Sequence, residues 1–238
     1  MVIAHRGASS YAPENTLAAF DLALRMGVRH IEFDVQSTAD GHIVVIHDDS
    51  VDRTTDGSGP VAGYALAALR TLDAGARFGP AFAAERIPLF EEVLERYRGR
   101  ARLHVELKGR SPGLSQGTAD LIRRHGMAGE VTITSFQRTR LEETHDYAPE
   151  LPTGWLVREM TDATITEARA LGLTQLCPRA DLVTADLVRR LHAAGFVVRA
   201  WGVGTEELMQ RVVDAGADGM TVNFPDKLVA YLDRRHKS

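Results

Sequence analysis

Cysteine is nearly absent from this sequence of 238 residues. Cys177 is the only one, so no disulfide can form within the chain. This excludes the small secreted folds that depend on disulfides. It favours a reducing compartment, and we expect a cytoplasmic protein.

Long apolar segments and basic runs are also missing. No stretch reaches the roughly 18–20 apolar residues that cross a bilayer, so we expect no stable membrane insertion. Residues 1–7 lack the basic and then apolar segments of a secretory signal, and we expect none. The net charge is −4 and Lys and Arg form no run, which argues against a nucleic-acid partner.

What the chain does have is a regular alternation of elements. Helical segments end near a glycine, and a short apolar strand follows within a few residues. Alternation of this kind over about 250 residues is typical of a (β/α)8 TIM barrel, here a single domain over residues 1–238. A doubly wound open sheet is the alternative, but no Gly-rich dinucleotide fingerprint follows the first strand. The eight expected strands cover residues 2–4, 30–35, 103–107, 131–134, 153–157, 175–177, 197–201 and 220–222.

Two segments stand out from this alternation. Pro13-Glu14-Asn15-Thr16 is expected to open the first helix, because proline and an acid suit a first helical turn. Residues from about 48 to 88 form a long stretch rich in Gly, Ala and Asp. A stretch of that length within a barrel is normally functional or a small subdomain, so we expect an insertion after the second strand and its hairpin.

Residues 30–55 contain the most informative pattern in the chain. Side chains two apart on a strand share a face, so Glu32 and Asp34 lie together, opposite Ile31 and Phe33. Asp-Gly at residues 40–41 predicts a hairpin that returns His47 towards these acids. Two carboxylates on one face repel each other unless a cation lies between them.

Other strands also end in polar residues. Active sites of such barrels lie at the C-terminal ends of the strands, where these residues would meet. The residues concerned are His5, Arg6, Glu32, Asp34, His47, Glu106, Lys108, Ser135, Phe136 and Trp201.

The residue types at these strand ends indicate a hydrolytic metal site. Glu32, Asp34 and Glu106 suit one hard divalent cation, Mg²⁺ or Ca²⁺. The chain lacks the Cys or paired-His ligands that zinc prefers. Two histidines indicate general acid–base chemistry. Arg6 and Lys108 beside a metal fit an anionic substrate, with phosphate the natural choice.

The order of these segments resembles the glycerophosphodiester phosphodiesterase family over nearly the whole chain. The resemblance is carried by residues 5–7 (HRG), 13–16 (PENT), 32–35 (EFDV), 47–48 (HD), 52–55 (DRTT) with Gly57 and Gly59, 78–79 (FG), 87–88 (IP), 106–108 (ELK), 135–136 (SF) and Trp201. A single one of these segments is weak, but the ordered set is specific.

The resemblance implies hydrolysis of small-molecule glycerophosphodiesters to glycerol 3-phosphate and an alcohol. It implies that His5 and His47 are the acid–base pair and that Glu32, Asp34 and Glu106 hold the metal. Arg6 and Lys108 would contact phosphate, Trp201 would line the alcohol side, and Phe136 would also bind the substrate. Gly202-Val203-Gly204 and Asn223 depart from the family's common residues at the mouth.

Two alternatives remain open at this point. A lysophospholipase D on the same scaffold would need an apolar rim, for which Phe78, Phe82 and Phe90 are the candidates. A non-enzymatic phosphodiester-binding protein would have lost an acid or a histidine, and all are present. The head group, the metal, the identity of acid and base, the nucleophile (water or a substrate hydroxyl) and the oligomeric state stay undecided.

Overall fold

A computed structural model describes residues 1–236 of the chain. Within this range eight parallel strands form a barrel, which closes because β1 pairs with β2 on one side and β9 on the other. The predicted TIM barrel is confirmed. The barrel strands are β1 (Val2–His5), β2 (His30–Ser37), β4 (Arg102–Leu107), β5 (Val131–Ser135), β6 (Thr153–Val157), β7 (Gln175–Pro178), β8 (Val197–Val203) and β9 (Gly219–Val222).

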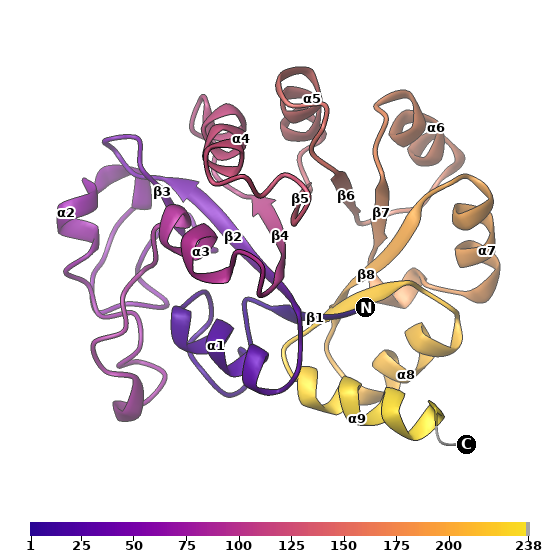
Figure 1. Cartoon of the computed structure of the whole chain (residues 1–238), viewed down its shortest axis with the longest axis horizontal. Coiled ribbons are helices and arrows are strands. Elements are labelled where there is room, and N and C mark those ends of the chain that lie inside the picture. The colour runs from indigo at the N-terminus through magenta and orange to yellow at the C-terminus, as the bar shows by residue number, and fades with distance from the viewer. Residues whose placement is uncertain (237–238) are drawn as a thin grey trace.

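In the part of the chain described, an outer helix follows each barrel strand before the next one begins, and Figure 1 shows these helices arranged around the outside. Each helix therefore covers the apolar outer face of the strands beside it. They are α1 (Leu17–Arg25), α3 (Phe90–Tyr97), α4 (Leu114–Arg124), α5 (Arg138–Tyr147), α6 (Asp162–Ala170), α7 (Ala185–Ala193), α8 (Glu206–Asp214) and α9 (Pro225–His236).

Strand β2 shows how the sequence separates the two faces of the barrel wall. Ile31, Phe33 and Val35 are buried in the main hydrophobic core between barrel and helices. The alternate residues Glu32 and Asp34 are also buried, on the opposite face. Burial on both faces is usual for a parallel strand, but here one buried face is charged.

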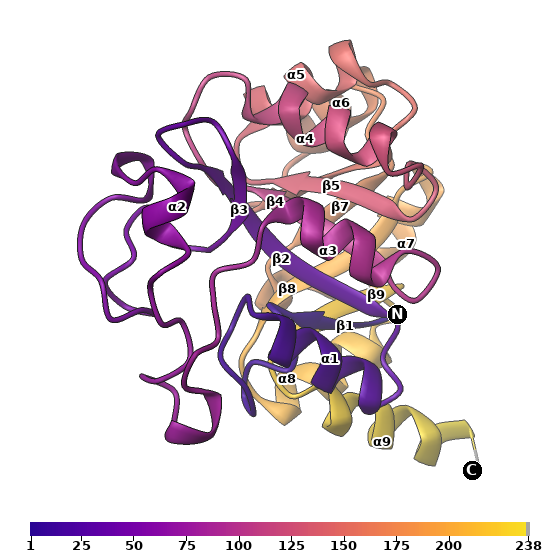
Figure 2. The same cartoon turned by 60° about the vertical axis from the view of Figure 1, so that its left-hand side comes forward.

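The hairpin after β2 is present, with β3 (Ile43–Val45) antiparallel to β2. Its loop spans residues 38–42, so the hairpin is not of the tight two-residue form. Beyond it, α2 (Leu66–Leu69) and two 3₁₀ helices (Val61–Gly63 and Pro80–Phe82) precede α3. In Figure 2 the strands point towards the side on which this segment lies, so the segment borders the C-terminal end of the barrel.

The segment between β3 and α3 has a small core of its own. Its buried apolar side chains form a cluster separate from the main core. They are Val44, Ile46, Val51, Val61, Leu69, Ala74 and Ile87. Packing of this kind fixes the segment as a platform beside the strand ends.

The expected start of the first helix was wrong. Thr16 is the N-cap, and its hydroxyl accepts a hydrogen bond from the Ala19 amide. Glu14 and Asn15 therefore precede the helix, and Asn15 has the left-handed backbone conformation with φ 58°. Proline followed by an acid favours a helix start. Here Glu14 and Asn15 turn towards the strand ends instead, so the helix begins after them.

The loop after β1 predicts a stability difference between two glycines. Gly7 and Gly41 have nearly the same φ, 81° and 83°. A Cβ on Gly7 would lie 2.6 Å from Ala19, whereas a Cβ on Gly41 would meet nothing within 4 Å. Gly41→Ala should cost about 1–2 kcal/mol for the left-handed backbone, and Gly7→Ala about 1–3 kcal/mol more through overpacking. Urea unfolding measures both, and equal losses would contradict the expectation.

Candidate functional site

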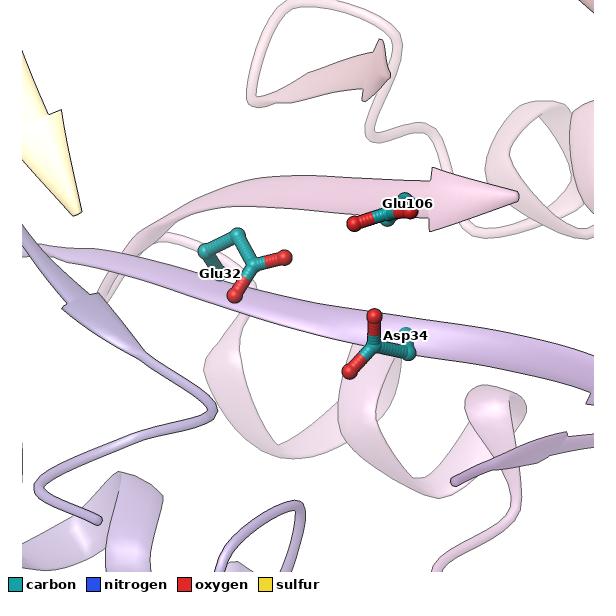
Figure 3. Close-up of side chains that lie close together, drawn as sticks. All are labelled: Glu32, Asp34 and Glu106. Carbon is teal, nitrogen blue, oxygen red and sulfur yellow. The ribbon is translucent and has the colours of Figure 1, made fainter. Parts of the chain in front are cut away.

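Three carboxylates converge inside the C-terminal end of the barrel. Glu32 and Asp34 lie on β2 and Glu106 on β4, and the parallel register pairs Asp34 with Glu106. One oxygen from each lies within 4.8 Å of the others. Figure 3 shows the three groups pointing towards one another from the two neighbouring strands.

Burial and mutual repulsion make this cluster electrostatically unfavourable on its own. Burial raises the pKa of Glu32 to about 8, and the nearby Asp34 carboxylate adds to this. The pKa of Glu106 is raised to about 8 for the same two reasons. A cation between the groups would remove the repulsion.

The donor set fits a hard divalent cation. All three groups offer carboxylate oxygens, which Mg²⁺ and Ca²⁺ prefer. Asp34 Oδ1 is buried and has no hydrogen-bond partner among the described residues. An unpartnered buried acceptor is costly, so this atom is well placed to be a metal ligand. The residues present therefore fit the cation expected from the sequence.

His5 lies at the end of β1, beside the carboxylates. Its Nε2 is 3.8 Å from Glu32 Oε2, and its Nδ1 lies 2.6 Å from Asn223 Oδ1. Because an amide oxygen only accepts, Nδ1 carries the proton and Nε2 faces the site with its lone pair. Burial, assisted by the charge of Arg6, lowers the pKa of His5 to about 4, which keeps the ring neutral.

His47 is held in the same way on the other side. Its Nδ1 lies 2.6 Å from Asp48 Oδ1, which leaves Nε2 for chemistry. Burial lowers the pKa of His47. The Gln36 amide donates to the carbonyls of His47 and Asp48 at 3.0 and 2.5 Å, which fixes the backbone of this pair.

Arg6 connects the first loop to the carboxylates. Its backbone N–H donates to the carbonyl of Glu32 at 2.8 Å, and its Nε lies 3.2 Å from Asp34 Oδ2. Its Nη1 donates to Glu14 Oε1 at 2.9 Å. Asn15 donates its side-chain amide to Asp34 Oδ2 at 3.0 Å, so the segment before α1 fixes the same carboxylate.

An open pocket of about 610 Å³ leads to the cluster. Lys108 lines it, 3.1 Å from Glu106. Phe136 also lines it and packs edge-on against Trp201, with ring centroids 4.8 Å apart. Arg158 lies 4.5 Å over the Phe136 ring. The pocket is therefore charged near the carboxylates and aromatic on one wall.

Arg53, from the segment after β3, joins the two sides of this site. Its Nε donates to Asp48 at 2.6 Å, and its two terminal nitrogens donate to Glu14 at 2.8 Å each. The hydrogen bond from Arg53 is the largest cause that lowers the pKa of Asp48 to about 2. Burial opposes a low pKa for Glu14, but Arg53 and Arg6 outweigh it and lower the pKa to about 2.

All the predicted site residues lie at this end of the barrel, and their roles stay predictions. Sequence reasoning gave no site role to four further residues: Glu14, Asn15, Arg53 and Asn223. Asn223 directly follows β9 and could have been found as a strand-end residue, although it was noted only as a departure from the family. Glu14 and Asn15 were read as a helix start.

The structure leaves fewer exposed phenylalanines for the apolar rim of a lysophospholipase D than the three that the sequence suggested. Phe78 is exposed and packs edge-on against Phe82. Phe90 is fully buried at the start of α3 and contributes nothing to a surface. No helix in the described range 1–236 is long and apolar enough to cross a membrane.

Comparisons with known proteins point in one direction. Residues 5–227 match the glycerophosphoryl diester phosphodiesterase family. A glycerophosphodiester phosphodiesterase of Caldanaerobacter subterraneus is 37% identical, covering 96% of each chain. One from Bacillus subtilis is 33% identical, covering 95% of this chain and 84% of that protein. The structure of an Oleispira antarctica phosphodiesterase in complex with the product sn-glycerol-3-phosphate is 31% identical, with a TM-score of 0.90 and coverage of 97% of this chain and 96% of that chain.

The low pKa values of Glu14 and Asp48 predict a stability term that depends on pH. Both lie at about 2, below the ordinary values of 4.5 and 3.8, so the term is present above about pH 4.5 and is lost as the pH falls towards 2. Arg53→Met removes the hydrogen bonds that are the largest of the causes lowering these two pKa values. The stability gap between wild type and Arg53→Met should therefore narrow on acidification. Urea unfolding at several pH values measures it, and a gap independent of pH would contradict the assignment.

Proposed function

Because this chain belongs to the glycerophosphoryl diester phosphodiesterase family and is an enzyme of that class, we propose that it hydrolyses glycerophosphodiesters to glycerol 3-phosphate and a free alcohol, in a metal-dependent reaction with histidine acid–base catalysis. The observation that carries the proposal is the meeting of three buried carboxylates with two histidines whose Nδ1 atoms are both hydrogen-bonded away from the site.

Glu32, Asp34 and Glu106 would hold one divalent cation, Mg²⁺ or Ca²⁺. Bound there, the cation supplies Lewis-acid polarisation of a phosphoryl oxygen. The other parts of the site act through the chain's own groups. Arg6 and Lys108 already lie against the carboxylates, and their charges would orient the anionic phosphodiester beside them.

His5 and His47 would divide the proton transfers. One Nε2 takes a proton from the attacking hydroxyl, and the other histidine, once its Nε2 has been protonated, donates that proton to the leaving alkoxide. Both rings keep a fixed orientation because Asn223 and Asp48 hold the opposite nitrogen. The same arrangement serves a water nucleophile, or the glycerol 2-hydroxyl, which expels the alcohol and leaves a cyclic phosphate that water then opens to glycerol 3-phosphate.

The phosphoglycerol end would lie at the charged part of the pocket, as suits an enzyme whose product is glycerol 3-phosphate. The similar Oleispira antarctica phosphodiesterase, whose structure is in complex with the product sn-glycerol-3-phosphate, supports this placement. The leaving alcohol then faces Phe136 and Trp201. We further propose that residues 1–238 act as one domain with the segment 48–88 as its insertion. A reducing cytoplasm suits the single buried Cys177.

The metal assignment predicts the effect of three conservative substitutions. Glu32→Gln, Asp34→Asn and Glu106→Gln should each weaken cation binding. Activity should fall by more than the roughly 10–100-fold typical of losing an outer partner of a metal ligand. Calorimetric titration with Mg²⁺ or Ca²⁺ and a product assay with several glycerophosphodiesters, with and without chelator, measure both effects. Glu95→Gln, an exposed carboxylate on α3, is the control. Full activity after chelation and dialysis would refute the metal role.

The acid–base assignment predicts a rate loss of roughly 10²–10⁴-fold for His5→Ala and for His47→Ala, because each removes one proton transfer. The fold should be kept, since neither ring is part of the hydrophobic core. Steady-state kinetics with glycerophosphocholine measures the loss, and circular dichroism checks the fold. A His47→Ala enzyme with near-normal kcat would exclude that residue from the mechanism.

A further inference from the structure

Arg53 uses the full planar fork of its guanidinium on two carboxylates. Nη1 and Nη2 donate to the two oxygens of Glu14, both at 2.8 Å, while Nε donates to Asp48 Oδ2 at 2.6 Å. Glu14 lies before α1, and Asp48 and Arg53 follow β3. One side chain therefore joins two loops that belong to different strands of the barrel. An ammonium group, a single point charge, does not match this three-bond geometry.

Each of the two carboxylates also holds a residue of the candidate site. Asp48 uses its other oxygen, Oδ1, on His47 Nδ1 at 2.6 Å. Glu14 Oε1 accepts from Arg6 Nη1 at 2.9 Å as well as from Arg53. A continuous chain of hydrogen bonds thus runs from His47 through Asp48, Arg53 and Glu14 to Arg6.

We infer that Arg53 is a positioning residue for the reaction, holding His47 through Asp48 and Arg6 through Glu14 without touching the substrate. This inference rests on the function proposed above. Arg53 does not line the 610 Å³ pocket beside the carboxylates, so its effect would pass through Asp48 and Glu14.

Removal of the guanidinium would release both carboxylates at once. Glu14 and Asp48 share one cation, so without it they are like charges close together and repel each other. If Asp48 moves, the His47 ring loses the acceptor that fixes its Nδ1–H form. If Glu14 moves, Arg6 loses one of its two carboxylate partners. A displacement of about 1 Å in a catalytic group is enough to cost about a hundredfold in rate.

A purely structural role fits Arg53 poorly. Its side chain is 48% exposed, so solvent screens part of its ion pairing, and stability alone does not explain why both of its carboxylate partners also hold site residues. Arg70 provides a matched comparison within the same segment. It also holds a carboxylate with two bonds, to Glu92 at 2.6 and 2.8 Å, and it is 33% exposed. Among the described residues, Glu92 is hydrogen-bonded to Arg70 and to the Leu89 amide and to no residue of the candidate site, so Arg70 has the two-bond ion pair of Arg53 but not its connections.

The first test compares Arg53→Met and Arg53→Lys with Arg70→Met in the full-length, metal-loaded enzyme. Arg53→Met should lower kcat/KM for glycerophosphocholine by about 10–100-fold. Arg70→Met should keep kcat/KM near wild type, and circular dichroism should show both variants folded at the assay temperature. Arg53→Lys should recover little. Near-normal kcat/KM in Arg53→Met, or an equal loss in Arg70→Met, would overturn the inference.

A double-variant cycle tests the route through Asp48. If Arg53 acts partly by fixing Asp48, Arg53→Met should cost less in an Asp48→Asn background than in wild type. Fully additive losses would overturn that route.

A third readout does not depend on activity. Long-range ¹H–¹⁵N NMR of the histidine rings, with the His47 signals assigned from a His47→Gln spectrum, reports which ring nitrogen carries the proton. Wild type should show the Nδ1–H form of His47, and Arg53→Met a mixture of forms. An unchanged form in Arg53→Met would overturn the inference, even if the rate falls. A wild-type enzyme that cleaves no glycerophosphodiester would refute the proposed function instead, and the NMR comparison would still decide the role of Arg53.

Discussion

The repulsion among three buried carboxylates is the constraint on which the rest of this site depends. Two strands in fixed parallel register hold Glu32, Asp34 and Glu106 together, and the barrel leaves them no room to separate. Positive groups surround them. Arg6 and Lys108 contact the cluster directly. Burial and Asp34 raise the pKa of Glu32, and the charges of Arg6 and of Arg199, buried on β8, partly oppose that rise. These positive charges reduce the repulsion, so the three carboxylates can remain buried inside the barrel. The cluster still favours a bound cation.

Rotamer freedom explains why many residues of the site are held by a second residue. A barrel strand fixes the position of a residue's Cα, but a long side chain at the end of a strand can still adopt several rotamers. Asn223 fixes His5, Asp48 fixes His47, and Asn15 fixes Asp34, each from a loop or turn outside the strand concerned. The precision of the site therefore comes from the loops, on a frame that the strands provide.

The fold and the strand-end residues could be predicted because their signals are local. A period of two places Glu32 and Asp34 on one face, and the recurrence of glycine before an apolar run marks six of the eight strands. The loop partners could not be predicted in the same way. The pairing of Arg53 with Glu14 joins residues 39 apart, in loops on different strands, and Asn15 next to Glu14 has a left-handed backbone before the Thr16 cap. Proline and an acid ahead of an apolar run look the same whether the helix starts there or three residues later. The suggestion that Phe90 belongs to an apolar rim was also wrong, because the exposure of a helix residue depends on which face of the helix packs against the core.

The aromatic wall of the pocket depends on a local irregularity in β8. The register between β8 and β9 shifts between Ala200 and Val203, and a bulge of this kind re-aims the side chains beside it. Trp201 lies within the shift, and its indole N–H donates to the carbonyl of Val157 at 3.1 Å. Gly202 follows with φ 74°, a conformation that favours glycine over any residue with a side chain. The backbone that orients Trp201 thus also keeps a glycine at the mouth. Phe136 and Trp201 therefore give this side of the pocket an aromatic surface, and the guanidinium of Arg158 lies over the Phe136 ring beside it.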